Sequence, residues 1–316
     1  MLVKTLSELT IQVLLEVAFE MDLGSAKGSG SFAQQYRQLS SDMDVILTST
    51  WMRQLPVYVM QLLLLPSWLV TERVRRVQEA RRRIDIVLDQ ALSAMLAKSD
   101  GEVSKGSFVS AIRSFSQWPG ITRPSVLDEM LLFLIAGHET TSHTMSWLCM
   151  NLAAHPAVQS KCHDAILRAT SSSQPSQLPE YVEAALLESM RLYPTVPGPT
   201  RQVTKVPFVI DVPVSGPGFD VVGGEEHKCE GQGQDRVSLS LPVGTHVNIN
   251  LLSLQRCEAT WGKDAHLYRP ERWIDSGLIS ANSIDYFGGA GFSPDSLSFA
   301  PFAFGQRRCV CVCVCA

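Results

Sequence analysis

A chain of 316 residues, 45% of them hydrophobic, is long enough to bury one large core or two ordinary ones. Its formal net charge of −4 gives no basic footprint for nucleic acid, so we expect no nucleic-acid partner. Four cysteines are scattered through the body of the chain without paired spacing: Cys149, Cys162, Cys229 and Cys257. That usage favours a reduced setting over a disulfide-bonded secreted scaffold.

The first 22 residues repeat apolar positions at helical spacing, with charged residues between them. This pattern predicts an amphipathic helix rather than a signal peptide. The most apolar stretch, residues 55–70, is shorter than the roughly 20 residues that a bilayer span needs. Pro56 and Pro66 divide it further. We therefore expect no membrane span in this chain.

Residues 71–98 are predicted to form a second amphipathic helix, whose apolar residues lie near one face: Val74, Val77, Ile84, Leu88 and Met95. The arginines between them could form a partner-binding surface. A solvated helix face is the interpretation that we prefer.

Residues 125–154 contain no proline and one glycine, so they are predicted to form a single helix. Ser125 and Asp128 resemble a capping box, and His155-Pro156 ends the segment. A helix of about 30 residues is about 45 Å long. We expect it to cross the whole domain.

A further helix is predicted between Pro179 and Pro194, after a polar linker at residues 170–179. Beyond it, residues 201–214 and 237–252 carry β-branched residues punctuated by glycine and proline, a pattern typical of short strands. The predicted fold is mainly α with a minor β part.

The motif AGHETT (136–141) interrupts the apolar run of the long helix. Gly137 could leave a gap beside the acid and alcohol of Glu139 and Thr140, and Thr140 can bond back to the carbonyl four residues earlier. A small ligand could lie in such a notch. The alternative is a helix–helix contact at Gly137 with Glu139 at the surface, and the residues alone leave both open.

Glu188 and Arg191 are three residues apart in ESMR, so they share one helix face and can pair. Arg272, in RPERW (269–273), could add a second guanidinium to the same carboxylate. From the residues alone, an ordinary surface ion pair is favoured over such a network.

The chain ends in FAFGQRRCVCVCVCA (302–316). Structural zinc sites usually space cysteines as Cys-x₂₋₄-Cys, so strict Cys-Val alternation at Cys311, Cys313 and Cys315 is not typical of one. Cys309 differs because of what precedes it. Gly305 permits a tight turn of backbone donors, Arg307 offers positive charge, and Phe302 can shield the sulfur. These features suit a single thiolate on a large flat metal cofactor.

Together, AGHETT, ESMR, YRPERW (268–273) and FAFGQRRC (302–309) occur in an order that resembles the cytochrome P450 family of haem-thiolate monooxygenases. The resemblance implies a partial fold of that family, with a long central helix and a cysteine haem loop. It implies one partial domain over residues 1–316, comprising a helical part (1–124), the two motif-bearing helices (125–193), and a part with strands and the haem-binding loop (194–316).

The resemblance also assigns roles. Cys309 would be the axial ligand of the iron of haem b. Arg307 and Arg201 would contact haem propionates, with Phe302 and Gly305 shaping the loop. Glu139 and Thr140 would be catalytic, relaying protons, whereas a structural network would comprise Glu188, Arg191 and Arg272.

The implied activity inserts one atom of O₂ into a hydrophobic small molecule, with electrons from NADPH through a reductase. The family's usual location is the endoplasmic reticulum membrane, although this chain shows no anchor. It departs from the family in lacking a Trp-x₃-Arg motif, in Gln255-Arg256 where His-Arg is common, and in Cys311 where glycine is expected. Alternatives are an inactive fragment, truncated at both ends, that holds no haem, and a metal-binding module built on the cysteine tail.

Overall fold

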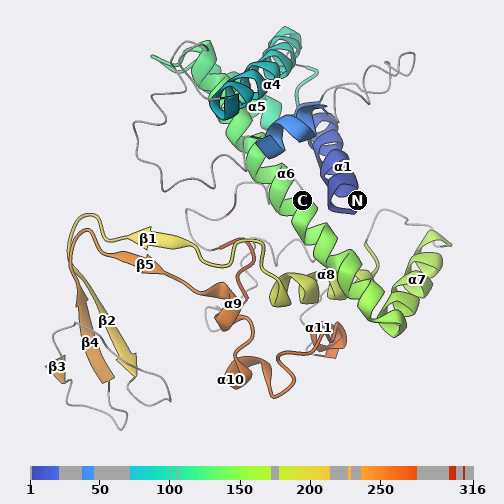
Figure 1. The fold of residues 1–316 in the computed structure, drawn as a ribbon, viewed down its shortest axis with the longest axis vertical. Coiled ribbons are helices and arrows are strands. Elements are labelled where there is room, and N and C mark those ends of the chain that lie inside the picture. Colours follow the sequence, from blue (N-terminus) through green and yellow to red (C-terminus); the bar gives the residue numbers. More distant parts are fainter. Residues whose placement is uncertain are drawn as a thin grey trace.

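The computed structural model describes residues 2–20, 38–45, 72–99, 101–104, 107–171, 178–213, 227–228, 236–275, 299–303 and 309. The longer helices in these ranges are α1 (Leu2–Val17), α4 (Glu72–Ala97), α5 (Phe108–Ser116), α6 (Arg123–Ala154), α7 (Pro156–Thr170) and α8 (Glu180–Leu192). Short helices follow the strands: α9 (Leu251–Leu254), α10 (Glu258–Trp261) and α11 (Glu271–Asp275). The described chain is mostly helical, as predicted (Figure 1).

Helix α6 runs through the helical part of the molecule and contacts helices at both of its ends (Figure 1). It begins two residues earlier than predicted. The N-cap is Thr122, whose side-chain oxygen accepts a hydrogen bond from the Ser125 backbone N–H, and Pro124 occupies the first turn. The predicted cap at Ser125 is therefore wrong, because proline tolerates the first turn and lets the helix start before it.

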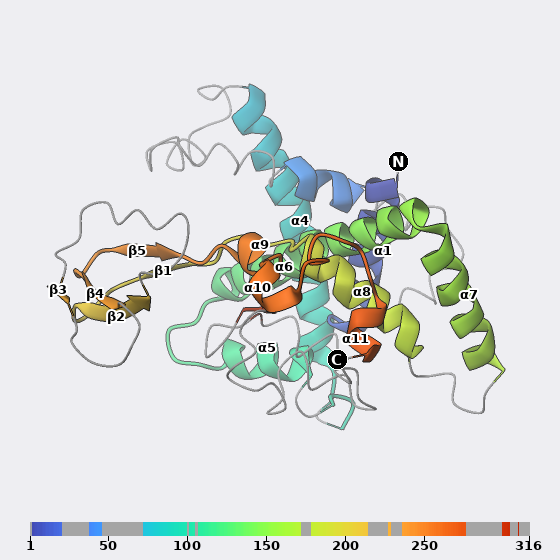
Figure 2. The same cartoon turned by 90° about the horizontal axis from the view of Figure 1, so that it is seen from below.

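Helices α1, α4 and α5 pack against the first half of α6 (Figures 1 and 2). They share one apolar core, which includes Leu15, Leu88, Met95, Met130 and Leu134. Ile84, Leu88 and Met95 of α4 are each at most 1% exposed, so the predicted apolar face of this helix is the one that packs. Its arginines are partly engaged within the chain, since Arg83 pairs with Asp42 at 2.7 Å.

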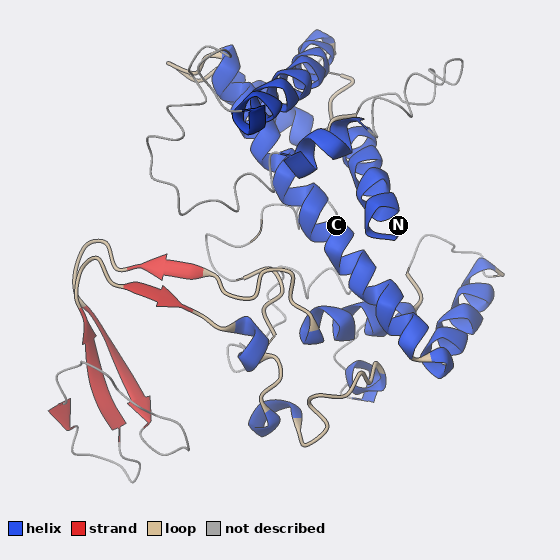
Figure 3. Ribbon diagram, in the orientation of Figure 1, coloured by secondary structure: helices blue, strands red, loops and turns tan. Residues whose placement is uncertain are grey.

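Helices α7, α8 and α11 lie at the other end of α6. The strands extend to one side of the helices and form two small antiparallel sheets (Figure 3). One pairs β1 (Thr200–Gln202) with β5 (His246–Asn248). The other has the order β2-β4-β3, from Phe208–Pro213, Arg236–Leu241 and His227–Lys228. The minor β part is thus where the sequence predicted it.

Residues 55–70, the most apolar stretch of the sequence, lie outside the described residues. Within the ranges that are described, no helix combines the length and the apolar character needed to cross a membrane.

Candidate active site

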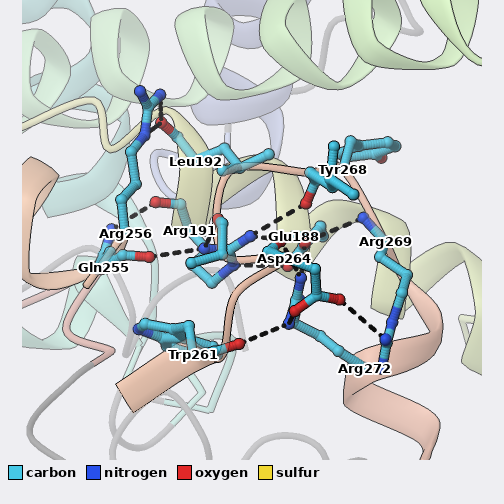
Figure 4. Close-up of polar contacts among 12 residues, drawn as sticks. Glu188, Arg191, Leu192, Gln255, Arg256, Trp261, Asp264, Tyr268, Arg269 and Arg272 are labelled. Atoms are coloured by element: carbon cyan, nitrogen blue, oxygen red, sulfur yellow. Dashed lines mark hydrogen bonds and ion pairs between the residues drawn. The ribbon is translucent and has the colours of Figure 1, made fainter. Parts of the chain in front are cut away.

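The carboxylate of Glu188 is the centre of a buried polar network that joins α8 to α11 and to the segment just before α11 (Figure 4). Arg191 reaches it with two parallel bonds, Nε to Oε2 and Nη2 to Oε1, both 2.8 Å long. Arg272 donates from Nε to Oε1 at 2.9 Å, and the Arg269 backbone N–H donates to the same oxygen at 3.0 Å. The indole N–H of Trp273 donates to Oε2 at 3.0 Å.

Burial distinguishes this network from an ordinary surface ion pair. The side chains of Glu188 and Arg191 are both 0% exposed, and that of Arg272 is 8% exposed. The helix spacing alone favoured the surface interpretation, which is wrong here. A buried carboxylate must have its lone pairs satisfied, and the five donors meet that need.

The guanidinium of Arg272 also contacts Asp264. Arg272 donates from Nη2 to the Asp264 carbonyl at 3.0 Å and lies 3.4 Å from an Asp264 carboxylate oxygen. Although partial burial raises the pKa of Asp264, the charges of Arg272 and Arg269 outweigh that effect and lower it. Asp264 therefore stays ionised and balances the excess positive charge beside Glu188.

Gln255 connects this network to the segment that precedes the cysteine. Its side-chain amide donates to the carbonyls of Met190 and Arg191, at 3.2 and 3.0 Å. Its oxygen accepts from the Ala300 backbone N–H at 3.2 Å. In the sequence, this position stands out only as a departure from a common His-Arg pair. Its contact with Ala300 could not be predicted, because the two residues are 45 positions apart.

Cys309 is half-buried, and its backbone N–H donates to the carbonyl of Phe302 at 2.8 Å. Phe302 is half-buried too and packs beside the cluster that contains Met190, Trp273 and Phe299. Gly305 and Arg307 lie outside the described residues, as do Cys311, Cys313 and Cys315.

Arg201 lies on β1, opposite Val247 of β5, and is exposed. Its guanidinium donates to the carbonyl of Thr200 at 3.0 Å. Its predicted role as a propionate contact stays a prediction.

In the middle of α6, Glu139 and Thr140 are half-buried. Thr140 donates to the carbonyl of Ala136 at 2.7 Å, the back-bond expected from the sequence. The helix remains continuous through the motif. A Cβ on Gly137 would lie 3.0 Å from Cδ2 of Leu14, so the space beside this glycine is filled by α1. Gly137 therefore makes a helix–helix contact with α1, the alternative to a ligand-binding notch at this glycine.

Two contacts that the sequence did not reveal tie α6 to the segment after α8. The hydroxyls of Thr144 and Thr195 lie 2.9 Å apart. The rings of Trp147 and Tyr193 stack with their centroids 4.2 Å apart. Thr140 and Thr144 are one turn apart, so these contacts fix the helix face that carries the Thr140 hydroxyl.

His138 faces the opposite way, into the contact with α1. It is 1% exposed, and its Nε2 lies 2.5 Å from the hydroxyl of Ser7, which in turn lies 2.9 Å from that of Ser40. Burial, with a smaller contribution from His143, lowers the pKa of His138 from 6.5 to about 4. The imidazole is therefore neutral at physiological pH.

Comparison with known proteins decides the family. The family model described as Cytochrome P450 matches residues 2–217 and 232–310, most of the chain and all four sequence motifs. The chain belongs to the cytochrome P450 family. This family comprises haem-iron oxidoreductases of the monooxygenase type.

Individual cytochrome P450 relatives are similar at modest identity. Secologanin synthase 1 from Catharanthus roseus is 27% identical over 97% of this chain and 51% of its own length. Cytochrome P450 72A552 from Barbarea vulgaris is 27% identical over 77% of this chain and 42% of its own. Cytochrome P450 monooxygenase 205 from Postia placenta is 36% identical over 47% of this chain and 25% of its own. The chain thus spans about half the length, or less, of the curated relatives that it matches.

Among the described residues, no group of three or more His, Cys, Asp or Glu side chains is placed to hold a metal ion. The cysteine tail of the alternative metal-binding module lies outside those residues.

Proposed function

We propose that the chain is the haem-thiolate part of a monooxygenase, with Cys309 as the axial ligand of the haem iron. The observation that carries the proposal is the position of Cys309. It closes a loop onto Phe302 inside the family match, and it follows a segment that Gln255 holds against α8.

The donor chemistry at Cys309 fits a haem group. Cys309 is half-buried, and the half-buried aromatic Phe302 stands at the start of its loop. A thiolate in partly shielded surroundings needs backbone donors and nearby positive charge to stay ionised. Gly305 and Arg307 are proposed to supply these, and Arg201 is proposed to bind a propionate. A thiolate-ligated haem supplies O₂ activation, because donation from sulfur favours O–O cleavage.

Glu139 and Thr140 are proposed as the catalytic acid and alcohol. In the described structure the Thr140 hydroxyl is held by the Ala136 carbonyl. It can rotate about one bond to present its proton on the half-buried face of α6. Glu139, the preceding residue, would replace that proton from the solvent side. Such a relay suits the two protons that reduction of O₂ consumes.

The overall reaction would take a hydrophobic substrate RH, O₂, NADPH and H⁺ to ROH, H₂O and NADP⁺. NADPH donates its electrons through a separate reductase, so the chain needs a protein partner and no nicotinamide site of its own. The printed names of relatives such as Cytochrome P450 monooxygenase 205 support this class of reaction. For a longer parent protein we propose the cytosolic face of the endoplasmic reticulum membrane.

Oxygen incorporation tests the reaction. The chain is expressed in the presence of a haem precursor and purified. It is then mixed with NADPH, a reductase, a set of apolar probes and ¹⁸O₂. One ¹⁸O atom in a product and one in water is the expected result. Full haem occupancy with no labelled product would overturn the monooxygenase assignment. Failure to retain haem would instead support the alternative, a fragment of such an enzyme that does not hold its cofactor.

A further inference from the structure

Gln255 is 0% exposed, and both polar atoms of its side chain are hydrogen-bonded. Its two N–H bonds go to the carbonyls of Met190 and Arg191, and its oxygen accepts from the N–H of Ala300. An amide offers two donors on one side and an acceptor on the other. Because two partners are carbonyls and the third is an N–H, only one orientation of the amide satisfies them all.

Each partner of Gln255 belongs to a part of the site already described. Met190 and Arg191 lie in the last turn of α8, and Arg191 also donates to the backbone carbonyl of Gln255 at 2.7 Å. The opposite end of the amide holds the backbone at Ala300. Gln255 is therefore the bridge between the Glu188 network and the chain that leads to Cys309.

From Ala300 a short series of backbone bonds continues to the cysteine. The Ala300 carbonyl accepts from the N–H of Ala303 at 3.1 Å, which closes a turn. Ala303 has φ 58°, in the left-handed region, so this turn is a defined and costly conformation for a residue with a side chain. The Phe302 carbonyl at the same turn then accepts from the N–H of Cys309.

We propose that Gln255 is a positioning residue for Cys309, acting through Ala300 and the turn at Phe302. The inference rests on the proposed function only in taking Cys309 to be the haem ligand. The mechanical link from Gln255 to Cys309 can be measured in the chain without haem.

Substitutions at this position separate hydrogen bonding from packing. Gln255→Met keeps the length of the side chain and removes all three bonds. Gln255→His keeps one donor and one acceptor in the neutral ring, so it can still bridge one α8 carbonyl and Ala300. The matched control is Asn151→Leu. Asn151 is a buried amide that donates to Ser189 of α8 at 3.2 Å, and among the described residues it has no hydrogen bond to the Ala300 segment.

The first measurement is residue-resolved hydrogen exchange at the Ala300 amide, together with the alkylation rate of Cys309 relative to exposed Cys257, both in the haem-free chain. Gln255→Met is expected to raise exchange at Ala300 about tenfold, the effect of losing one net hydrogen bond. Cys309 alkylation should accelerate several-fold. Gln255→His should recover part of both effects, and Asn151→Leu should cause neither.

The proposal is overturned if Gln255→Met causes no change at Ala300, or if Asn151→Leu causes the same change. A loosened Ala300 with unchanged Cys309 alkylation would also overturn it. If Gln255→Met does not fold, the wild-type chain decides. Protection of the Ala300 amide under native conditions supports the bridge, and exchange at the rate of an open peptide contradicts it. Loss of haem binding in the wild type would count against the proposed function, while leaving these readouts intact.

Discussion

Arg191 and Gln255 bind each other reciprocally, side chain to backbone in both directions. The guanidinium of Arg191 donates to the Gln255 carbonyl at 2.7 Å, and the amide of Gln255 donates to the Arg191 carbonyl at 3.0 Å. Because Arg191 is also the bidentate partner of Glu188, the buried ion pair and the support of the cysteine segment meet in one residue. The Glu188 network and the backbone at Ala300 therefore belong to one structural unit.

Glu188→Gln is expected to destabilise the fold by about 3–5 kcal/mol, because it leaves the buried guanidinium of Arg191 without its carboxylate partner and leaves Arg272 with Asp264 alone. It also replaces one accepting oxygen by a donor that faces the donors of Arg191 or Arg272. Urea unfolding followed by circular dichroism measures the loss.

An exposed ion pair provides the control for this variant. Oδ1 of Asp89 lies 2.5 Å from Nε of Arg123, and the two side chains are 47% and 43% exposed. Asp89→Asn is expected to cost much less stability than Glu188→Gln, because solvent-exposed pairs are screened by water. Equal losses in the two variants would contradict the structural role assigned to burial at Glu188.

Gly137 and Leu14 are expected to be energetically coupled, because a Cβ at Gly137 would lie 3.0 Å from the Leu14 side chain. Gly137→Ala gains about 1 kcal/mol of helix propensity but overpacks the contact with α1, which typically costs about 1–3 kcal/mol. Leu14→Ala opens the space. A double-mutant cycle should therefore give a favourable coupling of at least about 0.5 kcal/mol. Additive effects would show that the two residues do not touch.

Stability is expected to fall on acidification through His138. Its pKa is about 4 in the fold and 6.5 for an ordinary histidine, so the unfolded chain binds the proton more readily. The stabilisation is fully present above pH 6.5 and is lost as the pH falls towards 4. At pH 5 the loss amounts to roughly 2 kcal/mol.

The variant His138→Gln isolates this contribution from the carboxylates that titrate over the same range. Urea unfolding at pH 7.5 and pH 5.0 should show a smaller loss of stability in the variant than in the wild type. An identical pH dependence in both chains would mean that His138 is not buried in its neutral form.

Thr140→Val is expected to lower product formation by a factor on the order of 10², the usual contribution of a general acid–base group. The substitution keeps the branched shape of the side chain and removes the hydroxyl. Thr140→Ser retains the hydroxyl and should stay within a few-fold of the wild type. Haem content should be unchanged in both variants, and an unimpaired Thr140→Val enzyme would remove Thr140 from the proposed proton relay.

The sequence predicted most of the helical architecture because local signals were strong. Proline and histidine mark the end of α6, and Pro179 precedes α8, which ends two residues before Pro194. The buried face of α4 followed directly from its periodicity. The sequence did not predict Thr122 as the N-cap of α6. Pro124 suggested that the helix begins after it, but this proline occupies the first turn.

Long-range partners set the limit of the prediction for the site. The pairing of Glu188 with Arg191 was visible at helical spacing, but its burial depends on partners such as Arg272 and Trp273, more than 80 residues away. Gly137 was ambiguous because only the position of Leu14 decides what fills its space. Gln255 gave no functional signal beyond an unusual residue beside Arg256.

The most direct test of the account is the reduced CO-difference absorption spectrum of the chain loaded with haem. We predict a thiolate-shifted Soret band in the wild type and in Cys257→Ser, which replaces an exposed cysteine. Cys309→Ser should lose that band. A wild-type spectrum without the thiolate band, or a band that survives in Cys309→Ser, would contradict the claim that Cys309 is the haem ligand.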